Sequence, residues 1–208
     1  MGPREILWRA KGILVRRLLF QVCFGILCLF GAGAVAVAGD ASSDLGNLFA
    51  EHYEFRLGGF AHGVGGVESG SVDVNAELIF PQLWPNIVAP SWNWLVPRPH
   101  IGVSVNTAGK TDYGFAGGLW SFNVTRRFFV ETFVGGAVHD GTINGDPNRA
   151  ALGSRVLFHV GGSVGYRLTD NWNVLFTFEH LSNGNAALHA APSNQGLNEY
   201  GLRVGYLF

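Results

Sequence analysis

Polar and apolar residues alternate with a period of two along most of the chain. Successive residues of a β-strand point to opposite faces, so this alternation predicts strands that are apolar on one face and polar on the other. In one clear example, Val72, Val74 and Ala76 share one face, and Asp73 and Asn75 share the other. The pattern predicts eight strands, over residues 53–62, 71–80, 100–106, 112–124, 128–139, 155–168, 171–182 and 198–208.

The lengths of these strands favour a membrane barrel over a soluble sandwich. Strands of about 9–12 residues are long enough to cross a bilayer when tilted. The many Gly, Ser and charged residues on the polar faces suit the narrow interior of an eight-stranded barrel. The fold class is therefore predicted as all-β, an eight-stranded antiparallel transmembrane β-barrel. Its periplasmic turns would be 125–127 and 169–171, and its longer outer loops 62–70, 140–154 and 183–197. The connection 82–99 is an exception, because it is long and rich in Pro and Trp on the predicted periplasmic side.

The N-terminal segment follows a different pattern. Five basic residues lead into a compact apolar run, and Ala36-Val37-Ala38 fits the small-residue cleavage site of a signal peptide. We therefore predict a cleaved signal peptide over residues 1–38 and the outer-membrane β-barrel domain over residues 39–208. The alternative for the first segment is an N-terminal transmembrane helix. Cys23 and Cys28 both lie within it, so the mature chain has no thiol for a disulfide or a metal site.

Composition and charge agree with an exported barrel and exclude several other classes. Residues 1–38 hold five basic residues and one acid, so the remainder carries 9 basic and 14 acidic residues, a net charge of −5. No basic patch points to nucleic acid. The histidines are scattered, with no carboxylate cluster at ligand spacing, so no metal or other cofactor is predicted. The charged residues on the strands are expected to form an ion-pair network inside the barrel; they are Glu54, Arg56, Glu77, Glu131, Arg155, Arg167, Glu179 and Arg203.

Two residues near the end of segment 171–182 carry the candidate chemistry. His180 and Ser182 share the apolar face of their predicted strand with Phe178, which places a base and a nucleophile on a surface that meets lipid. Asn198 has the same outward phase, and pairing with His180 would bring their Cβ atoms to about 5 Å. Glu199 is out of step and should point inward, unless a bulge re-aims it. The third residue behind His180 is thus Asn198 or Glu199.

These residues resemble a known family, the PagL-type lipid A 3-O-deacylases of the outer membrane. The resemblance is carried by His180-Leu181-Ser182-Asn183, by Asn194-Gln195-Gly196-Leu197, and by a final strand that ends on Phe208. It implies an esterase in which His180 is the base and Ser182 the nucleophile, with Asn194 and Asn183 as candidates to bind the oxyanion. The position expected to carry a glutamate holds Asn198, and Glu199 follows it.

The predicted function is therefore an outer-membrane serine esterase that removes the 3-O-linked acyl chain of lipid A. The alternatives are a non-enzymatic small barrel with a structural or adhesive role, and a barrel acyltransferase that adds a chain to lipid A. The expected partners are lipid A or lipopolysaccharide as substrate and the surrounding outer-membrane lipid, with no nucleic acid, and a homodimer is left open. The expected location is the bacterial outer membrane.

Overall fold

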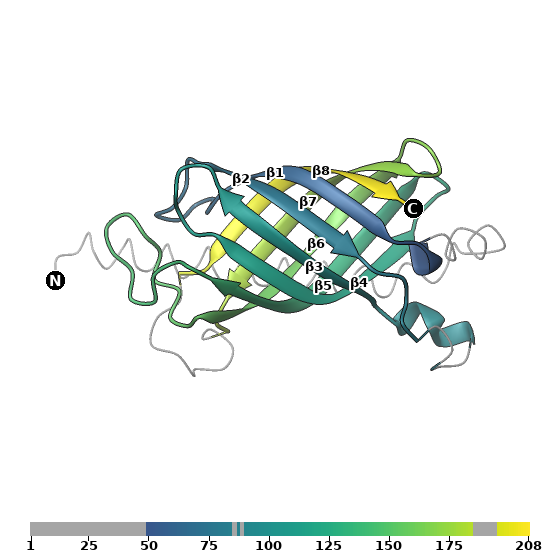
Figure 1. Cartoon of the computed structure of the whole chain (residues 1–208), viewed down its shortest axis with the longest axis horizontal. Coiled ribbons are helices and arrows are strands. Elements are labelled where there is room, and N and C mark those ends of the chain that lie inside the picture. The colour runs from purple at the N-terminus through teal and green to yellow at the C-terminus, as the bar shows by residue number, and fades with distance from the viewer. Residues whose placement is uncertain (1–48, 85–86, 88–89, 185–194) are drawn as a thin grey trace, which may run out of the picture. The chain divides into compact units, whose positions relative to one another are not determined.

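The computed structural model describes residues 49–84, 87, 90–184 and 195–208, and within them eight strands form a closed antiparallel barrel (Figure 1). This confirms the predicted barrel. The predicted signal peptide and its cleavage site lie outside the described residues. The elements are β1 Glu54–Ala61, β2 Val72–Ile79, the 3-10 helix η2 Pro90–Leu95, β3 Arg98–Asn106, β4 Tyr113–Asn123, β5 Phe128–His139, β6 Val156–Arg167, β7 Trp172–Ser182 and β8 Leu197–Leu207.

Each strand pairs with the next one in sequence, and β8 closes the barrel against β1. The closing ladder runs from Glu54 opposite Leu207 to Ala61 opposite Tyr200 without interruption. The ladder between β7 and β8 is also continuous, so no bulge changes the phase of β8 along its length. The direction of every side chain on β8 therefore follows from simple alternation.

The two ends of the barrel differ (Figure 1). At the turn end, which holds residues 124–127, residues 168–171 and the C-terminus, two of the connections are tight turns, such as that closed by the bond from Leu168 N to Trp172 O, 2.8 Å. At the loop end, residues 62–71, 107–112 and 140–155 form the connections.

The connection between β2 and β3 carries η2 at the turn end. Trp84, Trp92 and Trp94 of this segment are all more than half exposed, which suits a cluster of indoles at a membrane–water interface. No helix among the described residues has the length and apolarity needed to cross a membrane.

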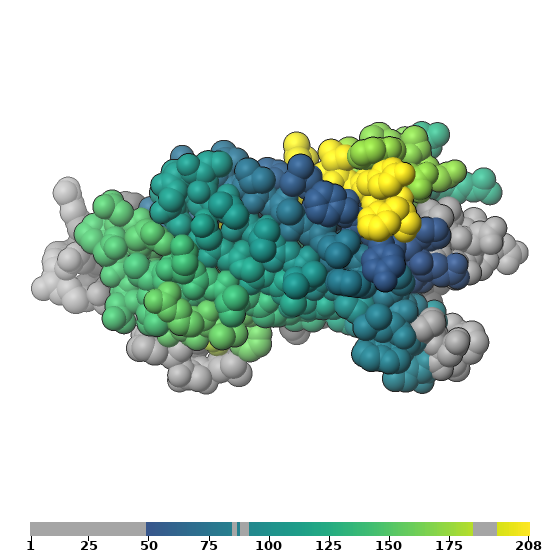
Figure 2. Space-filling view, viewed as in Figure 1, coloured from purple at the N-terminus to yellow at the C-terminus, as the bar shows by residue number. Residues whose placement is uncertain are grey.

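The outer surface of the barrel is apolar and its interior is polar. Outward residues such as Val74, Val103 and Phe176 are about half exposed although they are apolar. Figure 2 shows one face of this outer surface, where side chains of β1, β2 and β3 pack into a continuous layer. A barrel with an apolar exterior and a charged interior is the form expected in a membrane.

Ion pairs fill the middle of the barrel. Arg56 is fully buried and donates to Glu54 at 2.6 Å and to Glu131 at 2.7 Å. Arg203 likewise pairs with Glu179 and Glu77. Removing one member of such a network leaves a buried charge without a partner, which is strongly destabilising.

The predicted network was wrong for Arg155. This residue is exposed, and its guanidinium donates to the Gly141 carbonyl oxygen, 2.7 Å away, in the loop-end connection. The reason is that β6 begins one residue later, at Val156, so Arg155 is outside the alternation of the strand. Arg98, which the sequence placed in a connection, joins the network instead and lies 3.4 Å from Glu54.

Interior glycines make room for these long side chains. A Cβ on Gly58 would lie 2.4 Å from the Leu202 carbonyl oxygen and 2.7 Å from Cγ of Arg203. A Cβ on the next residue, Gly59, points to the outer face and would meet no atom closer than 3.9 Å. The inward glycine is therefore required by packing, whereas its outward neighbour is not.

Candidate active site

His180 and Ser182 lie on the outer surface near the loop end of β7. In the ladders, His180 is opposite Val160 of β6 and Asn198 of β8, and Ser182 is opposite Phe158. All of these residues belong to the outward phase, and Phe158 is about half exposed. The candidate base and nucleophile are thus surrounded by apolar side chains that would face lipid.

A hydrogen bond of 2.7 Å joins Nδ1 of His180 to Oδ1 of Asn198. The amide oxygen can only accept, so Nδ1 carries a proton, and in the neutral ring the lone pair is on Nε2. This is the tautomer that a general base needs. Within the described residues no hydrogen bond joins Ser182 Oγ to His180, but Ser182 lies two positions along the same face, and catalytic contacts commonly tighten only when substrate is bound.

Glu199 lies on the other side of the sheet. Its side chain is fully buried in the barrel, opposite Glu179 in the ladder, and the Tyr113 hydroxyl lies within hydrogen-bond distance of both carboxylates, at 2.9 and 2.8 Å. Because β8 has no bulge, Glu199 cannot turn outward to reach His180. Of the two candidates for the third residue, the structure brings only Asn198 to the histidine.

Of the two candidates for the oxyanion site, the structure describes only Asn183. The side-chain nitrogen of Asn183 donates to the Leu152 carbonyl oxygen at 3.1 Å, which ties the end of β7 to the 140–155 connection. Asn183 is therefore held beside Ser182, one residue further along the chain. Asn194 lies outside the described residues.

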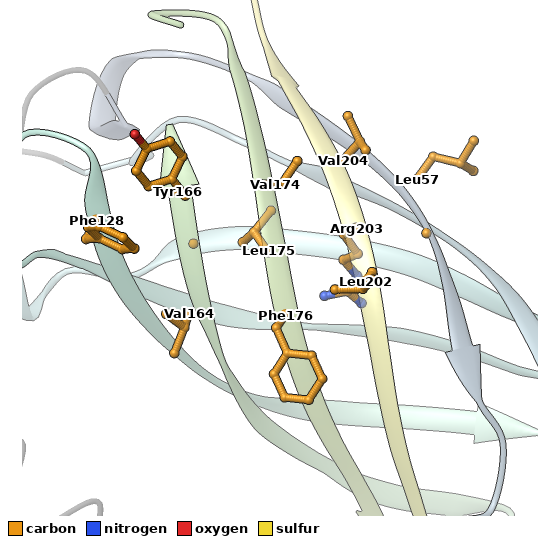
Figure 3. A pocket seen from close by; sticks show the side chains of 12 residues that line it. Leu57, Phe128, Val164, Tyr166, Val174, Leu175, Phe176, Leu202, Arg203 and Val204 are labelled. Atoms are coloured by element: carbon orange, nitrogen blue, oxygen red, sulfur yellow. The ribbon is translucent and has the colours of Figure 1, made fainter. Parts of the chain in front are cut away.

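A shallow apolar groove crosses the outer surface of β6, β7 and β8 (Figure 3). Val164, Phe176 and Leu202 line it, together with Leu57 from β1. Phe176 precedes Ser182 by six residues, so the groove begins roughly 20 Å from the serine at about 3.3 Å per residue. It belongs to the turn-end half of the barrel and is separate from the candidate catalytic residues.

A second cluster of titratable side chains lies inside the barrel at the loop end. The ring of His62 is fully buried, 2.9 Å from Asp73 and 3.1 Å from Glu68. Burial alone lowers the pKa of an imidazole, but the nearby carboxylates of Asp73, Glu199 and Glu68 outweigh it and raise the pKa of His62 to about 11.

The pKa of Glu68 moves in the opposite direction. Burial alone raises the pKa of a carboxyl group, but hydrogen bonds from His62 and from the Ala150 and Thr111 amides lower that of Glu68 to about 2. The spacing of the histidines along the chain did not predict this cluster.

The match to known families decides the class of the protein. The family model described as lipid A 3-O-deacylase (PagL) matches residues 88–207, more than half of the 208-residue chain. The chain belongs to the PagL family of lipid A 3-O-deacylases. This confirms the resemblance drawn from the His180–Asn183 stretch. The matched region contains β3 to β8, and so includes His180, Ser182 and Asn198, whereas β1 and β2 precede it.

Several solved structures align with this chain. The crystal structure of the outer membrane enzyme PagL aligns with a TM-score of 0.52 and 19% identity, covering 74% of this chain and 98% of that one. A de novo designed transmembrane β-barrel aligns with a TM-score of 0.48 and 13% identity, over 76% and 95%. The N-terminal β-barrel domain of Pseudomonas aeruginosa OprF has a TM-score of 0.46 and 13% identity, over 76% and 98%. No curated protein sequence matches the chain.

Proposed function

We propose that this protein is an outer-membrane esterase that hydrolyses the 3-O-linked acyl chain of lipid A, with Ser182 as nucleophile, His180 as general base and Asn198 as the residue that orients His180. The observation that carries the proposal is the 2.7 Å bond between His180 Nδ1 and Asn198 Oδ1 on the apolar outer face, two residues from Ser182. Membership of the PagL family supplies the substrate class.

The proposed reaction follows the steps of serine hydrolysis. Nε2 of His180 takes the proton of Ser182 as Oγ attacks the carbonyl carbon of the ester. The tetrahedral oxyanion collapses, the bond to the 3-oxygen of the sugar breaks, and His180 returns the proton to that oxygen. Water, activated by the same nitrogen, then releases the fatty acid from Ser182.

The position of the residues suits a lipid substrate. An acyl chain can lie along the apolar outer face, where Phe178 packs against Tyr200 with ring centroids 4.9 Å apart, while its ester remains near the loop end. The ester of lipid A lies close to the headgroup of the outer leaflet. We therefore place the loop end at the cell exterior and the turn end in the periplasm.

With Asn198 as the orienting residue, the proposed site should be a slower catalyst than one with a carboxylate. An amide oxygen orients the imidazole, but it stabilises the imidazolium of the transition state less than a negative charge does. Slow turnover is the expected consequence. Asn183, next to Ser182, would help to bind the oxyanion. Asn194 is a second candidate, which rests on the sequence alone. A homodimer stays a prediction.

The test is a mass spectrum of lipid A from a bacterial host whose lipid A carries a 3-O-acyl chain, with and without the full-length protein. Loss of one 3-hydroxyacyl chain is expected. Ser182→Ala and His180→Ala should abolish it, and Ser69→Ala, an exposed serine at the same end, should not. Electrophoretic heat-modifiability confirms that each variant is folded. Deacylation by folded Ser182→Ala would refute the mechanism, a gain of acyl mass would indicate an acyltransferase, and unchanged lipid A would indicate a barrel without this activity.

A further inference from the structure

Three buried side chains from separate parts of the barrel converge at the loop end. His62 directly follows β1, Asp73 is on β2 and Glu199 is on β8. Nδ1 of His62 lies 2.9 Å from Asp73 Oδ2 and 3.1 Å from Glu199 Oε1, and one such atom from each residue lies within 4.8 Å of the others. All three residues are completely buried. The arrangement is that of three ligand atoms around a common point.

Each of these side chains is held by a further partner that leaves one atom facing that point. Glu68 Oε2 lies 3.1 Å from Nε2 of His62, so the carboxylate can fix the ring with Nδ1 toward the centre. Asn106 donates to Asp73 Oδ1 at 2.6 Å, and the Tyr113 hydroxyl donates to Glu199 Oε2 at 2.9 Å. Outer partners of this kind orient the ligands in metal sites, and a carboxylate behind the histidine is a common one.

The cluster has more negative than positive charge. Glu199 Oε1 is buried and accepts no hydrogen bond, although it faces His62. The other donors to Asp73 and Glu199 are neutral, and no Arg or Lys among the described residues forms an ion pair with either of them. A single imidazolium would thus face two buried carboxylates. Leaving a buried carboxylate without a matching charge is costly, and a divalent cation would balance both.

We propose that His62, Asp73 and Glu199 bind one divalent transition-metal ion inside the loop end of the barrel. The site is independent of the proposed esterase, because its ligands face the interior and two of them precede the part of the chain that matches the PagL family.

The donor set selects the kind of ion. One imidazole nitrogen with two carboxylate oxygens suits first-row divalent metals, and Zn²⁺ is a suitable probe. Bonds of about 2.0–2.2 Å place tetrahedral ligand atoms roughly 3.3–3.5 Å apart. The separations of 2.9 and 3.1 Å from Nδ1 are within a small relaxation of that geometry. The ion would join β1, β2 and β8, and it would hold Glu199, the neighbour of Asn198.

The experiment uses the full-length protein folded in detergent micelles and treated with a chelator. Zn²⁺ is titrated by calorimetry, bound metal is measured by elemental analysis, and the midpoint of thermal unfolding is recorded. We expect one Zn²⁺ per chain and a higher midpoint with the metal. His62→Gln should lose this binding and the shift. His100→Gln, which alters another buried histidine held by a carboxylate at 2.6 Å, should retain both.

X-ray absorption of the zinc-loaded wild-type protein gives a measurement that does not depend on any variant. Coordination by a single imidazole with oxygen ligands is expected. Sulfur ligands, two or more imidazoles, the absence of stoichiometric binding, or equal binding by folded His62→Gln would each overturn the proposal. If His62→Gln does not fold, the wild-type spectrum decides. Lipid A deacylation by Ser182 is measured separately, so failure of either proposal leaves the other standing.

Discussion

Replacing Asn198 with aspartate should accelerate the proposed reaction. The carboxylate has nearly the shape of the amide, so one of its oxygens can occupy the position of Asn198 Oδ1, 2.7 Å from Nδ1 of His180. The hydrogen bond keeps its geometry and gains a negative charge. That charge acts mainly when His180 becomes an imidazolium, which happens in the transition state.

The size of the gain follows from the two kinds of hydrogen bond. A neutral hydrogen bond contributes about 1 kcal/mol and one to a charged group about 1.5–3 kcal/mol, a difference of about 0.5–2 kcal/mol. Since each 1.36 kcal/mol changes a rate tenfold, Asn198→Asp should raise kcat by about 2–30-fold. Both side chains are only half-buried and lie near the loop end, so screening by water at the membrane interface favours the lower part of that range.

The assay is the initial rate of fatty-acid release from lipid A by purified protein in micelles, which separates kcat from KM. Asn148→Asp is the matched control, because it adds the same charge at an exposed position of the loop end. Ser182→Ala gives the background. An Asn198→Asp protein that is folded but no faster than wild type would refute the role of Asn198, and an equal gain in Asn148→Asp would assign the effect to net charge.

Three further predictions concern the site and the barrel. Asn198→Ala should lower kcat by a factor on the order of 10², because nothing would hold the tautomer of His180; the same fatty-acid assay measures it, and an unchanged rate would contradict the orienting role. Gly58→Ala should lower the free energy of unfolding by about 1–3 kcal/mol through overpacking against Leu202 and Arg203, while Gly59→Ala should change it little; urea unfolding followed by tryptophan fluorescence compares the pair. Arg56→Met should cost about 3–5 kcal/mol in the same assay, because Glu131 would lose the buried cation 2.7 Å from it, and a loss below 1 kcal/mol would show that the network adds little.

The strands were predictable because one face of each strand meets an apolar environment and the other meets a charged interior. Apolar and polar residues therefore alternate along the sequence with a period of two. The largest error in a strand boundary is at β3, which begins at Arg98 and not at His100. Pro99 is the cause, since proline is normally a sign that a strand has not begun. Here Pro99 lies in the second position of the strand, opposite Gly118.

Residues that meet through the closure of the barrel were not predictable in this way. His62 and Glu199 come together only because β8 returns to pair with β1, and the register of that pairing is set by the whole circuit of eight strands. Alternation shows that Asp73 and Glu199 point inward, but it does not show which inward residues share a level of the barrel. The cluster around His62 therefore required the structure.

A neutral side chain at Asn198 suits the place where this residue lies. Asn198 faces outward among Tyr200 and Phe178, where a permanent negative charge next to acyl chains would carry a desolvation cost whenever substrate is absent. An amide avoids that cost and still orients His180. Glu199, the next residue, has its carboxyl group inside the barrel beside Tyr113 and His62. The two neighbours thus keep the neutral acceptor on the lipid side and the carboxyl group on the polar side, which for the proposed enzyme would favour stability in lipid over rate. Asn198→Asp tests both halves of this reasoning, because the variant should be faster and also less stable than the wild type.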